Sequence, residues 1–350
     1  MPISRFSPHW RTLFIVFLPL WLLACSQPKP TRMESFVFGT RVEIVALGAT
    51  EAKTQAVLGD VLRDFDRMHR TYHAWVGSDL MMVNAAFAKG ESLTVSDEML
   101  GLIQRAQTYA SKADYLFDPG IGQLVKLWGF HSDSYTPRLP AADALEKLRR
   151  AHPSIADVEI NGHEVRSRNP AVSLDFGGIA KGYALDRART LLLEAGIKDA
   201  LINIGGNVMA LGSKAGQPWT VGIQHPRQSG AMATLALYDG EAIGTSGDYQ
   251  RFFDLDGQRY CHLIDPRTAM PVRHTEAVTV LITAQTEAGL LSDVASKPIF
   301  LAAENWREMA SRMGVSHVLR VGGDGKIAVT EALRVRLRWA ENIKPDQVLP

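Results

Sequence analysis

The chain has 350 residues, a formal net charge of +1 and a hydrophobic content of 46%. Charges of both signs are interspersed along it, which argues against a nucleic-acid partner and against a polybasic membrane surface. It contains two cysteines and lacks CxxC and HExxH motifs, so neither a disulfide framework nor a structural zinc site is expected. This composition is typical of a globular protein that is stabilised by an apolar core.

The N-terminal segment resembles the leader of a bacterial lipoprotein. Residues 13–24 (LFIVFLPLWLLA) form an apolar run that follows two arginines and ends at Cys25. Such a run is too short to cross a bilayer as a mature helix and is typical of a signal peptide. Residues 22–25 (LLAC) resemble a lipobox, in which the cysteine is lipidated; an ordinary signal peptide with a chance cysteine is the alternative. We expect a signal peptide at residues 1–24, lipidated Cys25 and a tether at residues 25–33, and a protein anchored by lipid on the periplasmic side of a bacterial membrane.

Hydrophobic periodicity predicts helices and strands in the remainder of the chain. The expected helices are residues 51–69, 97–111 with Ser96 as N-cap, 141–151, and 180–195 before Gly196. The expected strands are residues 36–46, interrupted by a glycine, and residues 200–204, 219–223, 231–238, 259–264, 277–283 and 316–321. These elements lack a regular βαβ period, so we predict an α+β fold with mixed, mostly antiparallel sheets and flanking helices. Residues 34–345 are expected to form a single domain, which could have two lobes.

Glycine is concentrated in four short segments that also carry hydroxyl, carboxylate or amide side chains. They are residues 118–122 (DPGIG), 175–182 (DFGGIAKG), 203–207 (NIGGN) and 244–248 (GTSGD). Consecutive glycines allow backbone N–H groups to surround an anion, above all where a helix begins next. The second segment has this form, and Lys181 adds a cation at the helix start. A single segment of this kind is more often a plain turn, and the Rossmann and P-loop spacings are absent.

Taken together and in order, these segments resemble the ApbE family of FAD:protein FMN transferases. The matching segments are residues 38–40 (FGT), 78–84 (SDLMMVN), 117–122 (FDPGIG), 127–130 (LWGF), 174–184 (LDFGGIAKGYA), 203–207, 245–249 (TSGDY), 262–268 (HLIDPRT) and 292–293 (SD). The resemblance implies an ApbE-like fold, FAD as a substrate, and Mg²⁺ bound beside its diphosphate. It implies that FMN is transferred to a threonine hydroxyl of an acceptor flavoprotein or redox-complex subunit, with release of AMP. A flavin-binding protein that delivers FAD, and an FAD pyrophosphatase that uses water, are the alternatives.

The resemblance also assigns expected roles to individual residues. The positions expected to contact FAD are Phe38, Trp75, Phe117, Asp118, Asp175, Lys181, Thr245, Ser246 and His262. His262 and Asp293 are expected to be catalytic, and His262 would activate the acceptor hydroxyl because the pKa of imidazole lies near neutrality. The carbonyl of Gly178, the carboxylate of Asp293 and the position of Lys297 correspond to the metal site. For Asp118 and Asp175 a turn-capping role is the structural alternative, and for Trp75 core packing.

Three departures from the family pattern change the expected contacts. Phe38 stands where the family has methionine, and Asn207 stands where an aspartate commonly follows the two glycines. Ala269 replaces the glycine of the Pro-Arg-Thr-Gly turn, where alanine tolerates a positive φ less well.

The fourth departure lies at the metal position, where Lys297 replaces threonine. An ammonium cannot coordinate Mg²⁺, because it has no lone pair to donate. Lys297 could form an i,i+4 ion pair with Asp293 and weaken the metal site, or it could point at the diphosphate and supply part of the charge of the metal. We expect Pro298 to kink the helix, which would free Lys297 from the regular helix face.

Overall fold

The computed structural model describes residues 29–48, 50–132, 134 and 136–350. Cys25 and the expected signal peptide lie outside the described residues. In the described part of the chain, no helix combines the length and the apolar character that a membrane span requires.

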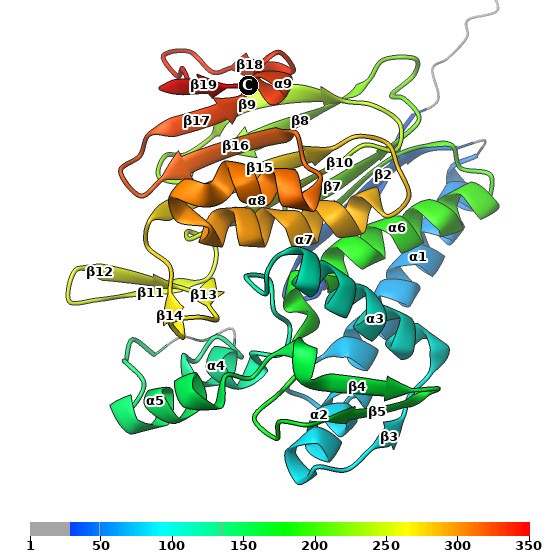
Figure 1. The fold of residues 1–350 in the computed structure, drawn as a ribbon. Helices are drawn as coiled ribbons and strands as arrows, with labels where there is room; N and C mark the ends of the chain where they lie inside the picture. The colour runs from blue at the N-terminus through cyan, green and yellow to red at the C-terminus, as the bar shows by residue number, and fades with distance from the viewer. Residues whose placement is uncertain (1–28, 49, 133, 135) are drawn as a thin grey trace, which may run out of the picture.

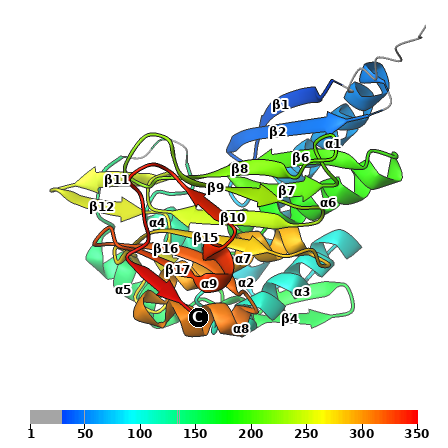
Figure 2. The same cartoon turned by 90° about the horizontal axis from the view of Figure 1, so that it is seen from above.

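A nine-stranded sheet forms the centre of the fold (Figures 1 and 2). Its strands, in spatial order, are β1 (Thr31–Val37), β2 (Thr40–Leu47), β6 (Asp199–Ile204), β7 (Asn207–Leu211), β10 (Ala242–Gly247), β15 (Thr275–Ile282), β16 (His317–Gly322), β17 (Ile327–Thr330) and β19 (Gln347–Leu349). Neighbouring strands are antiparallel except for β17 and β19, which are parallel. This topology confirms the predicted α+β class with mostly antiparallel sheets.

Smaller sheets and helices surround the central sheet. Two three-stranded sheets have the orders β18 (Leu337–Trp339), β9 (Ala231–Leu237), β8 (Trp219–Gln224), and β3 (Leu93–Thr94), β5 (Glu164–Ser167), β4 (Val158–Asn161). Two hairpins are β11 (Phe252–Leu255) with β12 (Gln258–Cys261), and β13 (Ile264–Asp265) with β14 (Met270–Pro271). The α-helices are α1 (Glu51–Tyr72), α2 (Asp79–Lys89), α3 (Asp97–Lys112), α4 (Gly122–Leu127), α5 (Ala142–Ala151), α6 (Ala180–Glu194), α7 (Ala288–Leu301), α8 (Trp306–Met313) and α9 (Glu331–Arg334).

The central sheet is covered on both faces (Figure 1). Strands β8 and β9 lie over one face and enclose an apolar cluster with β7, β15 and β16. Helices α1, α6, α7 and α8 cover the other face and enclose the larger cluster. Strand β15 shows the consequence, because all eight of its residues are buried. Its side chains alternate between the two clusters, with Leu281 in the first and Val280 and Ile282 in the second.

The predicted helices are confirmed, and the strand predictions need three corrections. Ser96 caps α3 through a hydrogen bond from Met99 N at 3.3 Å, and Gly196 follows α6 with φ 81°. The strand expected at residues 36–46 is a hairpin, because Phe38 and Gly39 both adopt positive φ at the turn. β1 also begins inside the expected tether. The strand expected at residues 259–264 is divided between β12 and β13.

Helix α7 was not among the elements that periodicity identified. Every one of its residues except Lys297 is buried, because it lies between the central sheet and helices α6 and α8. A helix that is buried on all sides carries little amphipathic signal, because apolar residues surround its few polar ones. Two glycines permit its close approach: a Cβ on Gly244 of β10 would collide with the carbonyl of Ser292, and a Cβ on Gly182 of α6 would lie 2.5 Å from the carbonyl oxygen of Gly289.

Candidate active site

Asp293 lies in the middle of α7, and its side chain is 1% exposed. Its Oδ2 accepts a hydrogen bond from Gly182 N at 2.9 Å, in the first turn of α6. Its Oδ1 accepts from Lys297 Nζ at 2.6 Å and lies 3.6 Å from Lys181 Nζ. Burial alone would raise the pKa of Asp293, but Lys181 and Lys297 hold it below its usual range. These four residues are called the Asp293 cluster below.

Lys297 forms the i,i+4 ion pair that was one of the two alternatives. Its Nζ donates to both Oδ1 and the backbone oxygen of Asp293, each at 2.6 Å. The expectation that Pro298 would free Lys297 from the regular helix face is wrong, since α7 continues to Leu301 with Lys297 above Asp293. Burial lowers the pKa of Lys297 to about 8, although Asp293 opposes this effect.

The two glycines before α6 lie against the Asp293 cluster. A Cβ on Gly178 would lie 3.1 Å from Cε of Lys297 and 3.1 Å from Cε2 of Phe117, so this glycine leaves room for both side chains. Lys181 Nζ donates to the carbonyl of Gly177 at 3.1 Å. Asp175 Oδ1 accepts from Gly177 N at 2.8 Å, which is the turn-capping role considered as its alternative. The structure therefore brings Phe117, Gly178 and Lys181 together with Asp293 and Lys297.

Ser246 and Thr245 are neighbours on β10, and their side chains point to opposite faces of the central sheet. Ser246 Oγ lies 2.8 Å from Ser296 Oγ, and Ser296 Oγ donates to the backbone oxygen of Asp293 at 2.9 Å. Thr245 Oγ1 lies 2.9 Å from Thr279 Oγ1 of β15. Ser246 is thus connected to the Asp293 cluster, whereas the hydroxyl of Thr245 lies on the face away from α7.

His262 lies between β12 and β13, and its Nδ1 is 3.2 Å from the carbonyl oxygen of Arg251. A carbonyl oxygen only accepts, so this contact places the ring proton on Nδ1 and a lone pair on Nε2. Burial, together with the charges of Arg251, Lys181 and Lys297, lowers the pKa of His262 to about 3. The ring is therefore neutral around pH 7 in the protein without bound ligands, and its pKa lies well below the near-neutral value expected from the residue type.

A small apolar cluster holds the two hairpins, β11–β12 and β13–β14, on either side of His262. The ring of Phe130 lies 6.4 Å from the imidazole of His262, edge to face. Phe130 also stacks on Phe253 of β11 with ring centroids 5.7 Å apart. Trp128 Nε1 donates to the backbone oxygen of Ala269 at 2.9 Å, and Ala269 adopts φ 61° in the position where the family has glycine. These contacts anchor both hairpins against the end of α4.

Phe38 and Trp75 lie along a row of aromatic rings. The ring centroid of Phe38 is 5.9 Å from that of His69, and His69 is 5.0 Å from His73. The ring of Trp75 lies 5.9 Å from His131, and its backbone N–H donates to Nδ1 of His73 at 3.1 Å. Within the described part of the chain, no hydrogen bond joins Phe38 or Trp75 to the Asp293 cluster.

Asp118 points into a loop. Its Oδ1 accepts from Gly120 N at 2.7 Å and from Ile155 N at 2.9 Å. Burial raises its pKa, against the lowering effect of Ser154 and of these two amides. These bonds to Oδ1 are the capping role that was considered as the alternative to FAD contact.

Two residues that the sequence analysis did not single out face the same region. Arg251 donates to the carbonyl of Phe130 at 3.0 Å and lowers the pKa of His262 through its charge. Burial raises the pKa of Asp175, and the charges of Arg251 and His73 oppose this rise. Arg251 follows the TSGDY segment by two residues, and this proximity was the only available signal.

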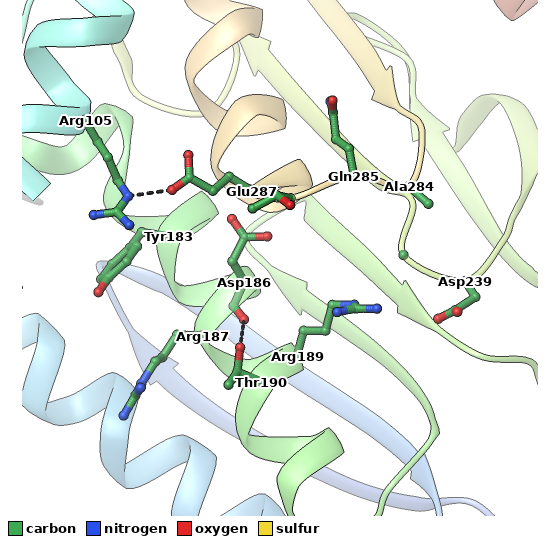
Figure 3. A pocket seen from close by; sticks show the side chains of 12 residues that line it. Arg105, Tyr183, Asp186, Arg187, Arg189, Thr190, Asp239, Ala284, Gln285 and Glu287 are labelled. Carbon is green, nitrogen blue, oxygen red and sulfur yellow. Dashed lines mark hydrogen bonds and ion pairs between the residues drawn. The ribbon is translucent and has the colours of Figure 1, made fainter. Parts of the chain in front are cut away.

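A cavity of about 630 Å³ opens at the other end of the crossing between α6 and α7 (Figure 3). Its lining includes three arginines, but acidic side chains accompany them. Arg105 Nε donates to Glu287 at 2.6 Å, and Asp186 accepts the backbone N–H groups of Gly289 and Leu290. None of the expected site residues lines this cavity, so we place the candidate active site at the Asp293 cluster, where those residues meet.

The side chains at the expected metal position do not fit Mg²⁺. This ion requires oxygen ligands in near-octahedral geometry at about 2.0–2.1 Å. Here the ammonium of Lys297 occupies the acceptor atoms Oδ1 and O of Asp293, and the stem of Lys297 lies across Gly178. Among the described residues, no group of three His, Cys, Asp or Glu side chains could hold a metal elsewhere.

The chain is similar in sequence to curated FAD:protein FMN transferases. It is 41% identical to the one from Rhodobacter capsulatus over 323 residues, which cover 92% of this chain and 61% of that protein. It is 30% identical to the one from Salmonella typhimurium, over 75% of this chain and 77% of that protein. A relative from Klebsiella pneumoniae is 37% identical over a region that covers 59% of this chain and 64% of that protein. The chain thus spans less than two thirds of the first and third of these relatives.

Solved structures show the same fold. The ApbE protein from Thermotoga maritima matches with a TM-score of 0.80 at 31% identity, over 89% of this chain and 100% of that chain. The apo form of the flavinyl transferase ApbE from Pseudomonas stutzeri matches with a TM-score of 0.76 at 27% identity, over 89% and 97% of the two chains. The family model for ApbE matches residues 38–319. The chain belongs to the ApbE family.

Proposed function

We propose that this protein transfers FMN from FAD to a threonine hydroxyl of an acceptor flavoprotein and releases AMP. The observation that carries the proposal is the meeting of Lys181, Lys297 and Asp293 at the glycines that precede α6, with His262 held by the carbonyl of Arg251. The names of the curated relatives support the same activity. The two ammoniums offer donors to a diphosphate, and the N–H groups at the start of α6 favour an anion beside them.

In the proposed reaction, the threonine oxygen attacks the phosphorus atom of the FMN half of FAD. A new O–P bond forms, and the bond from this phosphorus to the bridging oxygen breaks, so that AMP leaves with that oxygen. The threonine proton moves to Nε2 of His262, the ring nitrogen that carries the lone pair. The negative charge of the diphosphate offsets Lys181 and Lys297, and this raises the pKa of His262 from its ligand-free value of about 3.

Positioning and charge stabilisation supply most of the catalysis in phosphoryl transfer. Lys181 and Lys297 neutralise charge that develops on the departing AMP phosphate, and Asp293 holds both ammoniums in place. Because the residues at the expected metal position do not fit Mg²⁺, this scheme assigns no step to a metal ion.

The test combines the purified protein, FAD and an acceptor peptide with a Ser/Thr-Gly-Ala-Thr-like segment, the kind of target that the family resemblance implies. Mass spectrometry of the peptide detects covalent FMN, and chromatography detects AMP and free FMN. Covalent FMN on the peptide together with AMP supports the transferase. AMP with free FMN would instead indicate a pyrophosphatase, and bound FAD without either product would indicate a flavin-binding protein.

For the location of the protein, we propose a lipid anchor at Cys25 that holds the domain on the periplasmic side of a bacterial membrane, with an acceptor on the same side. The apolar run at residues 13–24 and the lipobox-like residues 22–25 support this proposal. Cys25→Ser should abolish incorporation of labelled fatty acid and leave the protein either unprocessed or in the soluble fraction. A wild-type protein found entirely in the cytosol with residues 1–24 intact would contradict the anchor.

A further inference from the structure

The two lysines of the Asp293 cluster retain donors for a ligand. An ammonium has three N–H groups. Lys297 uses two of them on Asp293, and Lys181 uses one on Gly177 while it remains 3.6 Å from Asp293 Oδ1. The side chains are 15% and 22% exposed, respectively, so a ligand can reach the remaining N–H groups. Both ammoniums flank the same carboxylate oxygen, so their remaining donors lie close to each other.

The packing around Lys297 favours this arrangement over an incoming cation. Gly178 has no side chain, and the stem of Lys297 fills the space beside it. A Cβ added to Gly178 would lie 3.2 Å from Cδ of Lys297. A divalent cation within bonding distance of Asp293 Oδ1 would compete with the ammonium that already binds this oxygen at 2.6 Å, and its charge would repel both ammoniums. If the ammonium of Lys297 were displaced, it would lose both of its partners on Asp293.

We propose that the ammonium of Lys297, together with that of Lys181, takes the place of a divalent cation, and that this protein binds the diphosphate of FAD without Mg²⁺. The inference rests on the proposed function, since it concerns the same FAD site. Two ammoniums and one carboxylate leave a net positive charge at the cluster, which attracts the anionic diphosphate. The protein thus supplies, through a side chain, charge that its relatives with threonine at this position would need to take from an ion.

The first experiment measures FAD affinity by isothermal titration calorimetry, once in EDTA and once in millimolar Mg²⁺. The wild-type dissociation constant should be the same in both within about threefold. Lys297→Thr should bind about 10- to 100-fold more weakly in EDTA, the factor that one charge-assisted hydrogen bond supplies, and Mg²⁺ should restore its affinity. Lys297→Met, which offers neither an ammonium nor an oxygen ligand, should bind weakly under both conditions.

The second experiment uses Mn²⁺ as a paramagnetic probe and records its electron paramagnetic resonance spectrum. With FAD present, the wild type should leave the Mn²⁺ spectrum as it is with FAD alone, and Lys297→Thr should convert it to that of protein-bound Mn²⁺. The inference is overturned if the wild type binds FAD only in Mg²⁺, or if it binds Mn²⁺ as well as Lys297→Thr does. The wild-type measurements decide this even if a variant fails to fold.

Transfer of FMN to the acceptor peptide separates this inference from the proposed function. Transfer by the wild type that requires Mg²⁺ would overturn the inference and leave the transferase standing. Transfer that proceeds fully in EDTA supports both. A wild type that binds no FAD under either condition would overturn the proposed function, and the inference with it.

Discussion

Asp293 and Asp186 occupy matching places on two crossing helices. Asp293 of α7 accepts the N–H of Gly182 in the first turn of α6, and Asp186 of α6 accepts the N–H groups of Gly289 and Leu290 in the first turn of α7. Each carboxylate therefore stabilises the N-terminus of the other helix. The glycines at the crossing are matched as well, since a Cβ on either Gly182 or Gly289 would lie within 3 Å of the backbone oxygen of the other.

The two ends of this helix crossing differ in the charged side chains that lie beside the carboxylate. Lys181 and Lys297 hold the pKa of Asp293 below its usual range in spite of burial. Burial raises the pKa of Asp186 to about 6, because it outweighs the lowering effect of the two backbone N–H groups that this carboxylate accepts. One helix-capping geometry thus produces a structural contact at one end and a charged, donor-rich site at the other. Side chains produce this difference: Lys181 and Lys297 lie beside Asp293, whereas Glu287 opposes the charge of Arg189 beside Asp186.

The largest effect is expected for His262→Asn, at the end of the crossing that carries Lys181 and Lys297. FMN transfer should fall about 10²- to 10⁴-fold, because the variant lacks a base for the threonine proton. FAD affinity should remain at the wild-type level, which titration calorimetry checks beside the transfer assay. His274→Asn, at a half-buried histidine that bonds Thr275, is the matched control and should transfer FMN normally. Equal losses of affinity and rate in His262→Asn would assign the residue to substrate positioning instead.

Asp293→Asn and Asp186→Asn compare the two ends directly. Asp293→Asn leaves Lys181 and Lys297 without their counter-charge and should lower the free energy of unfolding by about 3–5 kcal/mol. Asp186→Asn keeps an oxygen for one backbone N–H and loses the bond to the other, so its cost should be about 1–3 kcal/mol. Urea denaturation of both variants measures the difference. Equal costs would mean that the lysines do not distinguish the two carboxylates.

Lys181→Ala should weaken FAD binding about 10- to 100-fold, and it should lower the melting temperature less than Asp293→Asn does, because Lys297 still pairs with Asp293. Asp175→Ala should weaken FAD binding and also destabilise the protein by about 0.5–2 kcal/mol, because Asp175 caps Gly177. Lys198→Ala, at an exposed lysine, is the control for the loss of a positive charge. Normal FAD affinity with early melting in both site variants would make these residues structural.

The pH dependence of stability should have opposite signs at the two ends of the crossing. The pKa of His262 is lowered to about 3 in the folded state, so the unfolded chain binds this proton more readily and acid destabilises the fold below about pH 6.5. The pKa of Asp186 is raised to about 6, so the folded state binds this proton more readily, and the stabilisation is lost as pH rises through about 6.

Urea denaturation between about pH 4 and 7 measures both contributions, each at most about 1.4 kcal/mol per pH unit. His262→Asn should make the fold less sensitive to acid, and Asp186→Asn should make it more sensitive. His163→Asn, at an exposed histidine, is the control for the loss of a histidine side chain. Shifts of the same sign in the two test variants would contradict the assignment of either pKa.

Local sequence was sufficient for helices α1, α3, α5 and α6 and for the family motifs. It was insufficient for α7, which is buried on all sides, and for the β1–β2 hairpin, whose turn depends on positive φ at Phe38 as well as at Gly39. Among the expected site residues, the alternation of side chains along β10 separates Thr245 from Ser246. Only the tertiary structure shows that Ser246 faces α7 and that Thr245 faces away from it.

The sequence by itself determined the family, the α+β class and the spacing that allows Asp293 and Lys297 to share a helix face. Which of the two alternatives Lys297 adopts was decided by tertiary structure. Pro298 removes one backbone hydrogen bond from α7, but burial between the sheet and helices α6 and α8 keeps the helix continuous to Leu301. Likewise, the low pKa of His262 follows from burial and from cations on other elements, which lie far away in the chain. Long-range packing sets the charge state of this site, and no local pattern encodes it.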